Sequence, residues 1–284
     1  MTGDAGTAGT AGDAGELAAA GLRLAIDQAG AVATVTLSRP ERRNAMTPAM
    51  WQGLAAIGRS LPPRVRVVVI RGAGPSFSAG IDLRLFSPEG VPGEEPLADA
   101  RSPAGGAGGS PLQAGTAFEQ RIAAYQAGFS WLRRPDIVTI AAVHGHAIGA
   151  GFQLALACDL RVLADDATLC MKEPALGLVP DLTGTKPLVG IVGLPRAIEL
   201  CLTARTVGAA EARELRLAEL VVPAAELDGA VSDLVAALLG TDAAAARATK
   251  ELLCQAAANT LEQQAAAERR AQSTLLRGRL SRGG

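Results

Sequence analysis

One segment constrains the fold more than any other. In residues 137–159 an apolar run, a glycine-rich turn and an alanine-rich stretch follow one another without a break. The run 137–143 is β-branched and apolar on both faces, which is typical of a parallel strand buried on both sides. Three glycines keep the turn free of side chains, and helix-favouring residues follow, so the N–H groups around Ala150 open a helix without internal partners. Such a helix start can hold an anion or a developing oxyanion.

A second strand and turn of similar construction lie upstream. Residues 65–70 read VRVVVI, another strand buried on both faces, and they lead into a loop that extends to residue 83. Two loops at the ends of strands can bring free N–H groups to one carbonyl oxygen. The pattern therefore predicts an α/β fold, and it disfavours a nucleotide-binding dehydrogenase because the glycines of the central turn lack the G-x-G-x-x-G spacing.

Composition narrows the possible functions. The 284 residues suit one large domain or two modest ones, and an apolar content of 49% is ample for a core. A net charge of −1 shows no excess of basic residues of the kind that binds nucleic acid. No stretch approaches the roughly 20 apolar residues of a membrane span. Four cysteines without paired short spacing and two histidines suggest neither a metal site nor a disulfide framework, so we expect reduced thiols in a cytoplasmic protein.

Three stretches differ from the central pattern. Residues 1–20 are rich in Gly, Ala and Thr without a signal-peptide pattern, and they predict a disordered tail. Residues 87–116 are dense in Gly, Pro and Ala and predict a mobile loop, either a lid or plain disorder. Residues 205–284 have helical periodicity and predict a C-terminal helical region. The core domain then spans 21–204, with a β-hairpin at 22–37 and helices that begin at Thr47 and near Ala117.

Three motifs, in the right order, resemble those of the crotonase, or enoyl-CoA hydratase/isomerase, superfamily. SRPERRNA (38–45) resembles its first loop, FSAGIDL (77–83) its acyl-CoA loop, and residues 140–159 its central turn and helix. The resemblance extends from about Leu24 to about Gln255. It implies a crotonase (ClpP-like) β-β-α spiral core, with a C-terminal helical region that supports a homotrimer or a dimer of trimers. It also implies an acyl-CoA thioester as ligand and no cofactor, since CoA is part of the substrate.

The same resemblance implies a set of site residues. The backbone N–H groups of Ile81 and Ala150 would form an oxyanion hole for the thioester carbonyl. The residues implied in substrate and CoA binding are Ser78, Ala79, Gly80, Asp82, Leu83, Arg84, Arg43 and Gly149.

Glu173 and Gln153 are the catalytic candidates. Hydratases of the family usually carry two glutamates about twenty residues apart; Glu173 matches the second position and Gln153 stands at the first. An amide cannot accept a proton as a general base, although it could position a water. Hydration is thought to use both carboxylates, whereas moving a double bond between the 3- and 2-positions needs one base. The departure therefore favours isomerisation over hydration.

Other interpretations stay open at this point. The chain could be a non-catalytic, long-chain acyl-CoA-binding homologue in which Gln153 is a trace of lost chemistry. Glu173 could be a solvated charge or the partner of Lys172 or Lys186, and Gln153 a polar helix residue bonded to backbone. A hydrolase with Ser78 as nucleophile and a histidine base is disfavoured, because residues 74–78 do not spell a nucleophile elbow.

Overall fold

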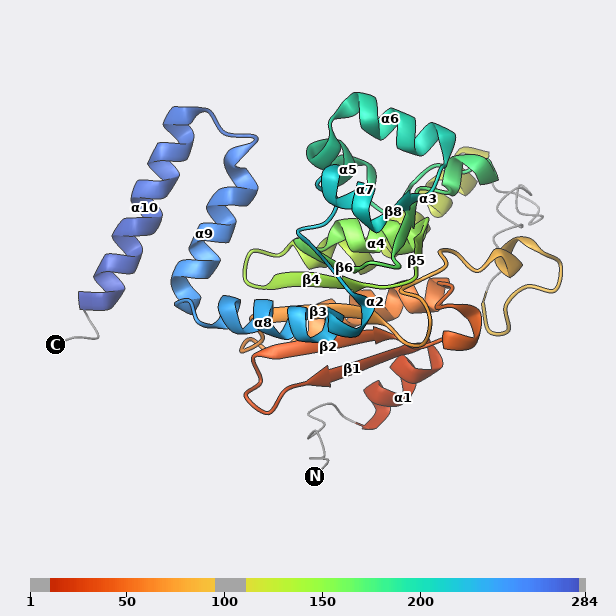
Figure 1. The fold of residues 1–284 in the computed structure, drawn as a ribbon, viewed down its shortest axis with the longest axis horizontal. Helices are drawn as coiled ribbons and strands as arrows, with labels where there is room; N and C mark the ends of the chain where they lie inside the picture. The colour runs from red at the N-terminus through yellow and green to blue at the C-terminus, as the bar shows by residue number, and fades with distance from the viewer. Residues whose placement is uncertain (1–10, 95–110, 281–284) are drawn as a thin grey trace.

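The computed structural model describes residues 11–94 and 111–280, and its strands form two sheets (Figure 1). The larger sheet has the order β1-β2-β3-β4-β6-β9, and the smaller one has the order β5-β7-β8. In the larger sheet β1 is antiparallel to β2 and all other neighbours are parallel. The strands are β1 (Leu22–Ile26), β2 (Val32–Leu37), β3 (Val67–Gly72), β4 (Val138–Val143), β5 (His146–Ile148), β6 (Leu160–Ala164), β7 (Thr168–Cys170), β8 (Val207–Gly208) and β9 (Leu220–Val222).

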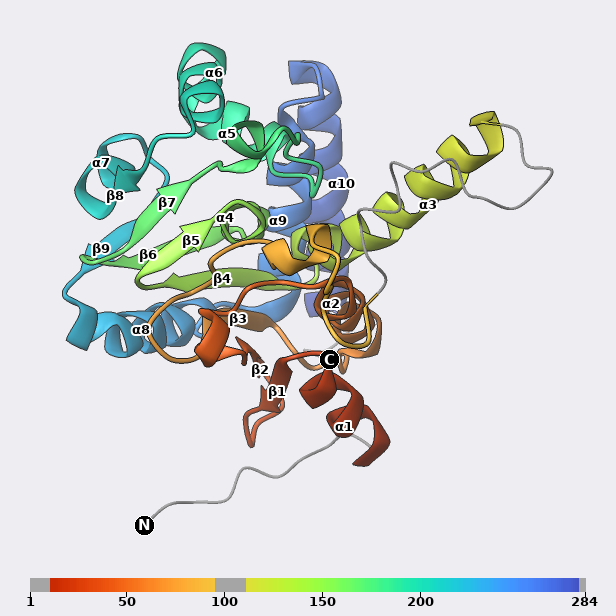
Figure 2. The same ribbon diagram turned by 90° about the vertical axis from the view of Figure 1, so that its right-hand side faces the viewer.

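Helices cover both faces of the larger sheet. The α-helices are α1 (Ala11–Ala19), α2 (Pro48–Ser60), α3 (Pro111–Ser130), α4 (Ala150–Ala157), α5 (Thr185–Val192), α6 (Leu194–Thr203), α7 (Ala209–Glu214), α8 (Leu227–Leu239), α9 (Ala243–Ala256) and α10 (Leu261–Leu280). The 3-10 helices are η1 (Pro40–Arg42), η2 (Leu83–Phe86), η4 (Trp131–Arg133), η5 (Glu173–Leu176) and η6 (Ala224–Glu226). Figure 2 shows that the first half of α3 extends beyond the body of the molecule.

The predicted burial of the central strands on both faces is confirmed. On one face the sheet packs with α2, α3 and α4 into the main hydrophobic core, which includes Phe77, Phe129 and Phe152. On the other face Val69 and Ile140 belong to a second cluster, to which α8 contributes Leu227 and Val231. Figure 1 shows α8 lying across this second face. The sheet is therefore the middle layer of an α/β fold.

Two local predictions from the sequence are also confirmed. The hairpin forms as β1 and β2, and the Asp27 carboxylate accepts hydrogen bonds from the N–H groups of Ala31 and Val32 at 2.8 and 2.9 Å across the turn. Helix α2 begins as expected, because the Thr47 hydroxyl accepts a hydrogen bond from the N–H of Met50 at 3.3 Å. Proline at the first helical position fits this start, since its missing N–H would have no helical partner there.

The predictions of unstructured segments are corrected in part. Residues 11–19 of the predicted tail form α1, whose Leu17 packs against the main core and so stabilises the helix. Residues 111–116 of the predicted mobile loop are the beginning of α3. The loop is also held at its start, since the Glu94 carboxylate accepts from the N–H of Ala49 in the first turn of α2 at 3.1 Å. Residues 1–10 and 95–110 of these two predictions lie outside the described residues.

The predicted domain boundary at residues 204–205 is wrong, because the chain returns to both sheets after it. Strand β9 pairs with β6, β8 pairs with β7, and α8 covers the second face of the larger sheet. Figure 1 shows that α9 and α10 stand apart from the body. The core therefore continues to about residue 239, and the separate C-terminal part is a pair of helices.

Two cationic side chains connect that helix pair and the end of α8 to the rest of the structure. The Arg66 guanidinium donates to the carbonyl oxygens of Leu239 and Thr241 at the end of α8, at 3.1 and 2.8 Å. The Lys250 ammonium, on α9, donates to the Ile137 carbonyl and to the Asp159 carboxylate, both at 2.6 Å. Charged side chains therefore connect the end of α8 and the middle of α9 to the body of the molecule.

No single helix in residues 11–94 and 111–280 is long and apolar enough to cross a membrane. One pair of helices, residues 224–239 and 243–256, would together be long and apolar enough, but the two are bent at 102° to one another.

Candidate active site

The loops that follow β3 and β4 meet at one edge of the larger sheet. Because β3 and β4 are parallel neighbours, their carboxyl ends lie side by side. The loop after β3 then runs along β5, with the N–H of Ser78 donating to the carbonyl of His146 at 2.7 Å and that of Ile148 donating back to Ser78 at 3.0 Å. Gly80 has a φ of +90°, and a Cβ there would lie 2.6 Å from the Ile148 carbonyl oxygen. Only glycine permits so close a contact between the two loops.

The two predicted oxyanion donors flank this contact. The Cβ position of Gly80, the residue before Ile81, lies 3.7 Å from the Ala150 nitrogen. Ala150 is the first residue of α4, so its N–H has no helical partner. Across residues 11–94 and 111–280, neither the Ile81 N–H nor the Ala150 N–H donates to a protein group. The structure thus places two free donors at adjoining loops.

Buried polar side chains fix the loop after β3 through hydrogen bonds to its backbone. Asn44 is fully buried, and its amide nitrogen donates to the carbonyls of Ala73 and Ser76 at 2.8 and 2.7 Å. Ser78 is also fully buried, and its hydroxyl donates to the Asn44 carbonyl at 2.8 Å and accepts from the N–H of Gly80 at 3.2 Å. The Ser78 hydroxyl is therefore engaged with the backbone of the loops, and a contact of Ser78 with a ligand stays a prediction. The same bonds exclude Ser78 as the nucleophile of a hydrolase.

Asp82 likewise supports the loop instead of facing a ligand. Its carboxylate is 5% exposed and accepts from Arg84 Nη2 at 2.7 Å and from Arg39 Nη2 at 3.1 Å. The hydrogen bond from Arg84, with that from Arg39, lowers the pKa of Asp82 to about 2, although burial acts in the opposite direction. Asp82 is therefore a structural anion that fixes the turn directly after Ile81.

The remaining residues predicted to bind the ligand differ in how far their side chains are exposed. The Ala79 N–H donates to the Arg43 carbonyl at 2.8 Å, which joins the loop after β3 to the segment at residues 38–45. Arg43 and Leu83 have exposed side chains and Arg84 is half-buried, so these three can contact a ligand at the rim. Gly149 lies within the site itself.

Glu173 stands at the start of η5, beside the turn that precedes α4. It is 7% exposed, and a Cβ on Gly149 would lie 3.1 Å from its Oε1 atom. Its other oxygen, Oε2, is buried without a hydrogen-bond partner among the described residues. Burial is the main cause that raises the pKa of Glu173, and the nearby negative charge of Asp181 adds to the increase. The burial of Glu173 contradicts the interpretation as a solvated charge. No ion pair with Lys172 or Lys186 is found in the described part of the chain, which contradicts the interpretation as a salt bridge.

Gln153 contacts Glu173 directly, and its orientation is fixed. Its Nε2 donates to Glu173 Oε1 at 2.6 Å, while its Oε1 accepts from the N–H groups of Leu182 and Gly184 at 2.9 and 3.2 Å. Backbone N–H groups can only donate, so the amide oxygen must face them and the amide nitrogen must face Glu173. Gln153 therefore supplies a hydrogen-bond donor at this position. Its oxygen is not free to position a water.

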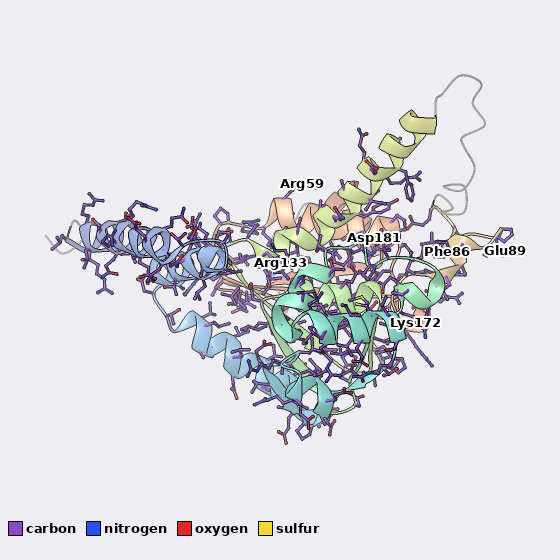
Figure 3. The ribbon with its side chains drawn as sticks, turned by 90° about the horizontal axis from the view of Figure 1, so that it is seen from above. Arg59, Phe86, Glu89, Arg133, Lys172 and Asp181 are labelled. Carbon is purple, nitrogen blue, oxygen red and sulfur yellow. The ribbon has the colours of Figure 1, made fainter. Side chains whose placement is uncertain are left out.

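Sequence reasoning missed Asp181. This half-buried residue directly precedes Leu182, and its carbonyl accepts from Gln126 Nε2 of α3 at 2.7 Å. Burial raises the pKa of Asp181, as it does for Glu173. Figure 3 places Asp181 near the middle of the body, with Phe86 and Lys172 on the side away from α9 and α10. The signal in the sequence was a second carboxylate eight residues after Glu173.

The histidines and cysteines take no part in this arrangement. His144 Nε2 lies 2.8 Å from the Gly74 carbonyl oxygen, and His146 Nδ1 lies 3.1 Å from Thr168 Oγ1. The four cysteines are free thiols. No group of three or more metal-ligating side chains occurs within the residues that the structure describes. The site therefore consists of two backbone donors, a buried carboxylate, an oriented amide and a second carboxylate.

Fold and site together define a class of α/β protein in which two free backbone donors lie near a buried carboxylate, an arrangement that can stabilise negative charge on a carbonyl oxygen. Comparisons with known proteins agree. The enoyl-CoA hydratase/isomerase family matches residues 108–281. A solved structure of a candidate enoyl-CoA hydratase from Thermobifida fusca YX, in complex with acetoacetyl-CoA, is 62% identical with a TM-score of 0.85, and the match covers 93% of this chain and 98% of that chain.

Two curated relatives show the chemical range of the family. Carnitinyl-CoA dehydratase of Escherichia coli strain K12 is 35% identical over 227 residues, which are 78% of this chain and 77% of the relative. The peroxisomal Delta(3,5)-Delta(2,4)-dienoyl-CoA isomerase of Arabidopsis thaliana is 30% identical over 232 residues, 80% of this chain and 78% of the relative. The chain therefore belongs to the enoyl-CoA hydratase/isomerase family, whose members are enzymes that process acyl-CoA thioesters.

Proposed function

We propose that this enzyme moves the double bond of an enoyl-CoA thioester between the 3- and 2-positions in preference to adding water to it. The observation that carries the proposal is the orientation of Gln153. Its Nε2 donates to Glu173 and its oxygen is occupied by two backbone N–H groups. The position at which a hydratase has its other glutamate thus supplies a donor to Glu173 and no base.

The free donors and the carboxylate give the substrate its orientation. The thioester oxygen lies between the N–H groups of Ile81 and Ala150, each of which contributes about 3–4 kcal/mol to the developing enolate. Glu173 Oε2 has no hydrogen-bond partner among the residues that the structure describes, and it can accept the proton from C2. A pKa raised by burial makes this carboxylate a stronger base than an exposed glutamate, which favours proton abstraction.

The CoA moiety is expected at the rim of the site. Arg43, Leu83 and Arg84 have side chains that are at least partly exposed there, and the arginines can contact phosphate groups. The Thermobifida fusca YX structure with acetoacetyl-CoA supports an acyl-CoA thioester as the ligand of this chain. The mechanism uses only groups of the chain and the substrate, so CoA enters as part of the substrate and no further cofactor is invoked.

The test is turnover of two substrate series by the purified protein. We expect conversion of 3-enoyl-CoA to 2-enoyl-CoA, with hydration of trans-2-enoyl-CoA slower by about 100-fold or more. Glu173→Gln should abolish isomerisation while leaving binding of a saturated acyl-CoA unchanged. Tight acyl-CoA binding without turnover of either series would instead support the non-catalytic alternative, and faster hydration than isomerisation would refute the assignment of Gln153.

We also propose a homotrimer, or a dimer of such trimers. Helices α9 and α10 contain no buried residue, and Leu253, Leu261 and Leu280 are 70, 87 and 79% exposed. A helical pair that buries so little apolar surface gains little to offset the entropy of ordering it. Contact with a second copy would bury that surface. Sedimentation at several protein concentrations distinguishes a trimer from a monomer; a cytoplasmic location stays a prediction from the sequence.

A further inference from the structure

Two buried polar side-chain atoms, Glu173 Oε2 and Trp51 Nε1, lack a hydrogen-bond partner among the residues that the structure describes. In the proposed function the substrate supplies the partner of the first, because Oε2 accepts its proton. Trp51 is 3% exposed, so bulk water does not reach its indole N–H. A buried N–H without an acceptor is costly, and native structures seldom keep one unless a water or a ligand supplies the acceptor. The N–H of Trp51 therefore needs a partner that the described residues do not provide.

The second tryptophan of the chain provides a comparison at nearly the same place. Trp131 Nε1 donates to the Gly128 carbonyl of α3 at 3.0 Å. Gly128 also contacts Trp51, because a Cβ there would lie 2.4 Å from the Trp51 carbonyl oxygen. Both tryptophans therefore pack where α2 and α3 meet, and of the two only Trp51 lacks a partner in the described part of the chain.

Trp51 lies one turn into α2, whose start is joined to the loop that carries the Ile81 donor. Met46, two residues before α2 begins, donates its N–H to the Gly80 carbonyl at 2.7 Å and accepts from the N–H of Asp82 at 2.9 Å. These two bonds pair Met46 with Ile81 as a β-bridge. Side chains of an α-helix lean toward its N-terminus. The indole of Trp51 therefore extends toward the end of α2 that borders Ile81.

Trp51 also packs against the part of α3 that reaches the turn beside Glu173. The rings of Trp51 and Tyr125 have centroids 5.0 Å apart and are tilted by 55°. The next residue of α3, Gln126, donates from Nε2 at 2.7 Å to the carbonyl directly before the 182–184 turn. The N–H groups of that turn bond to the amide that contacts Glu173. Trp51 is thus connected to both halves of the site, through α2 to the oxyanion donor and through α3 to the proposed base.

We propose that the Trp51 N–H donates to an oxygen on the acyl chain of the substrate, beyond the carbons that react, and that the enzyme thereby selects oxygen-substituted acyl-CoA thioesters. The proposal rests on the proposed function, which places the thioester oxygen at Ile81 and Ala150 and C2 at Glu173. The remainder of an acyl chain held at these points, directed away from the CoA rim, extends toward the start of α2 and the neighbouring part of α3.

The indole suits an uncharged acceptor. It offers one N–H without a charge, and Trp51 belongs to the main hydrophobic core together with Tyr125 and Phe129. A carboxylate in such surroundings would lose more hydration than one neutral donor returns. A hydroxyl, keto or ether oxygen is satisfied by a single bond of this kind, and the rest of its chain can lie among apolar side chains. The substrate class is therefore an acyl-CoA with a neutral oxygen substituent.

Indole resonances test the contact in the wild-type protein without any turnover. Nitrogen-15 labelling of the two tryptophans gives two indole N–H signals, which either Trp51→Phe or Trp131→Phe assigns. Hexanoyl-CoA is compared with hydroxyhexanoyl-CoA that carries the hydroxyl at C4, C5 or C6. At least one hydroxyl isomer should move the Trp51 proton signal downfield relative to hexanoyl-CoA, whereas the signal of Trp131, whose donor is already paired, should not distinguish the ligands. A Trp51 signal that responds alike to hexanoyl-CoA and to all three isomers would overturn the proposal, because a buried water or the Tyr125 ring would then be its partner.

Trp51→Phe tests the same donor by affinity, since it removes the N–H and keeps an aromatic ring against Tyr125. In titration calorimetry the isomer that moves the Trp51 signal should bind the variant about fivefold or more weakly, with the Kd for hexanoyl-CoA within about twofold of wild type. Trp131→Phe is the matched control and should change the ratio of the two affinities by less than about twofold. An equal loss for both ligands in Trp51→Phe would show that Trp51 serves packing alone and would overturn the proposal.

Failure of the proposed function gives a different result. A wild-type protein that prefers the hydroxyl isomer through Trp51 but isomerises no 3-enoyl-CoA, substituted or not, would refute the isomerase assignment and leave the Trp51 contact standing. Isomerisation of 3-enoyl-CoA with no preference for any hydroxyl isomer would do the reverse.

Discussion

Asp82→Asn tests whether charge holds the loop that presents the Ile81 N–H group. The carboxylate is 5% exposed, and Arg84 approaches it with two side-chain nitrogens at 3.0 and 2.7 Å. Arg39 approaches from the other side at 3.1 Å. An amide has nearly the same shape and retains one oxygen that can accept from the N–H of Arg84. The substitution therefore removes the charge with little change in packing.

The magnitude follows from the pKa of Asp82. It falls from 3.8 to about 2 in the folded protein. A difference of about 1.8 pKa units corresponds to about 2.4 kcal/mol, since one unit is worth 1.36 kcal/mol. The Arg84 side chain is 35% exposed, so solvent screens part of the attraction and about 1.5 kcal/mol is the better expectation. Because the folded-state pKa is depressed, this stabilisation is complete above the unfolded pKa of 3.8 and is lost as the pH falls through about 2.

Urea unfolding from pH 7 to pH 3 measures this contribution. The free energy of unfolding of Asp82→Asn should lie about 1.5 kcal/mol below wild type at pH 7, and the difference should shrink below pH 4. Asp228→Asn is the control, since Asp228 also pairs with an arginine, Arg71, at 2.9 Å, but its side chain is 71% exposed. It should change stability by less than about 0.5 kcal/mol. A deficit of Asp82→Asn that stays constant from pH 7 to pH 3 would show that packing, and not charge, is responsible.

Three further outcomes are expected. Gly149→Ala should lower kcat by about 100-fold, because its Cβ would lie 3.1 Å from Glu173 Oε1 at a φ of +50°; a rate near wild type would show that the carboxylate can move. Isomerisation should be lost as the pH falls through the raised pKa of Glu173, so a pH–rate profile should have its acid midpoint above the ordinary 4.5, and a midpoint at or below 4.5 would contradict the effect of burial. Lys250→Met should cost about 3 kcal/mol in urea unfolding, because it leaves Asp159 without its cation, and a loss below about 1 kcal/mol would show that α9 is held by other contacts.

The elements that the sequence predicts well are those whose patterns are local. The hairpin of β1 and β2, the Thr47 cap of α2 and the burial of β4 are each encoded by residues that are close together in the sequence. The errors concern contacts made at long range. Helix α1 is stabilised by Leu17 against the core, and β9 joins the sheet 56 residues after β6 ends, at a position that local periodicity cannot reveal. Periodicity identified the C-terminal helices but could not show that α8 belongs to the core.

The same distinction applies to the site. Ile81, Ala150 and Glu173 can be proposed from the sequence, because each occupies a position in a motif that resembles one of the family. Whether a Gln153 side chain offers its nitrogen or its oxygen to Glu173 is decided by two N–H groups that lie 29 and 31 residues later in the chain. Reversed, the same amide would be an acceptor next to a carboxylate and would favour the protonated form of Glu173. The hydrogen bond that favours the anion of Glu173, the proposed base, is therefore fixed by the backbone of the 182–184 turn.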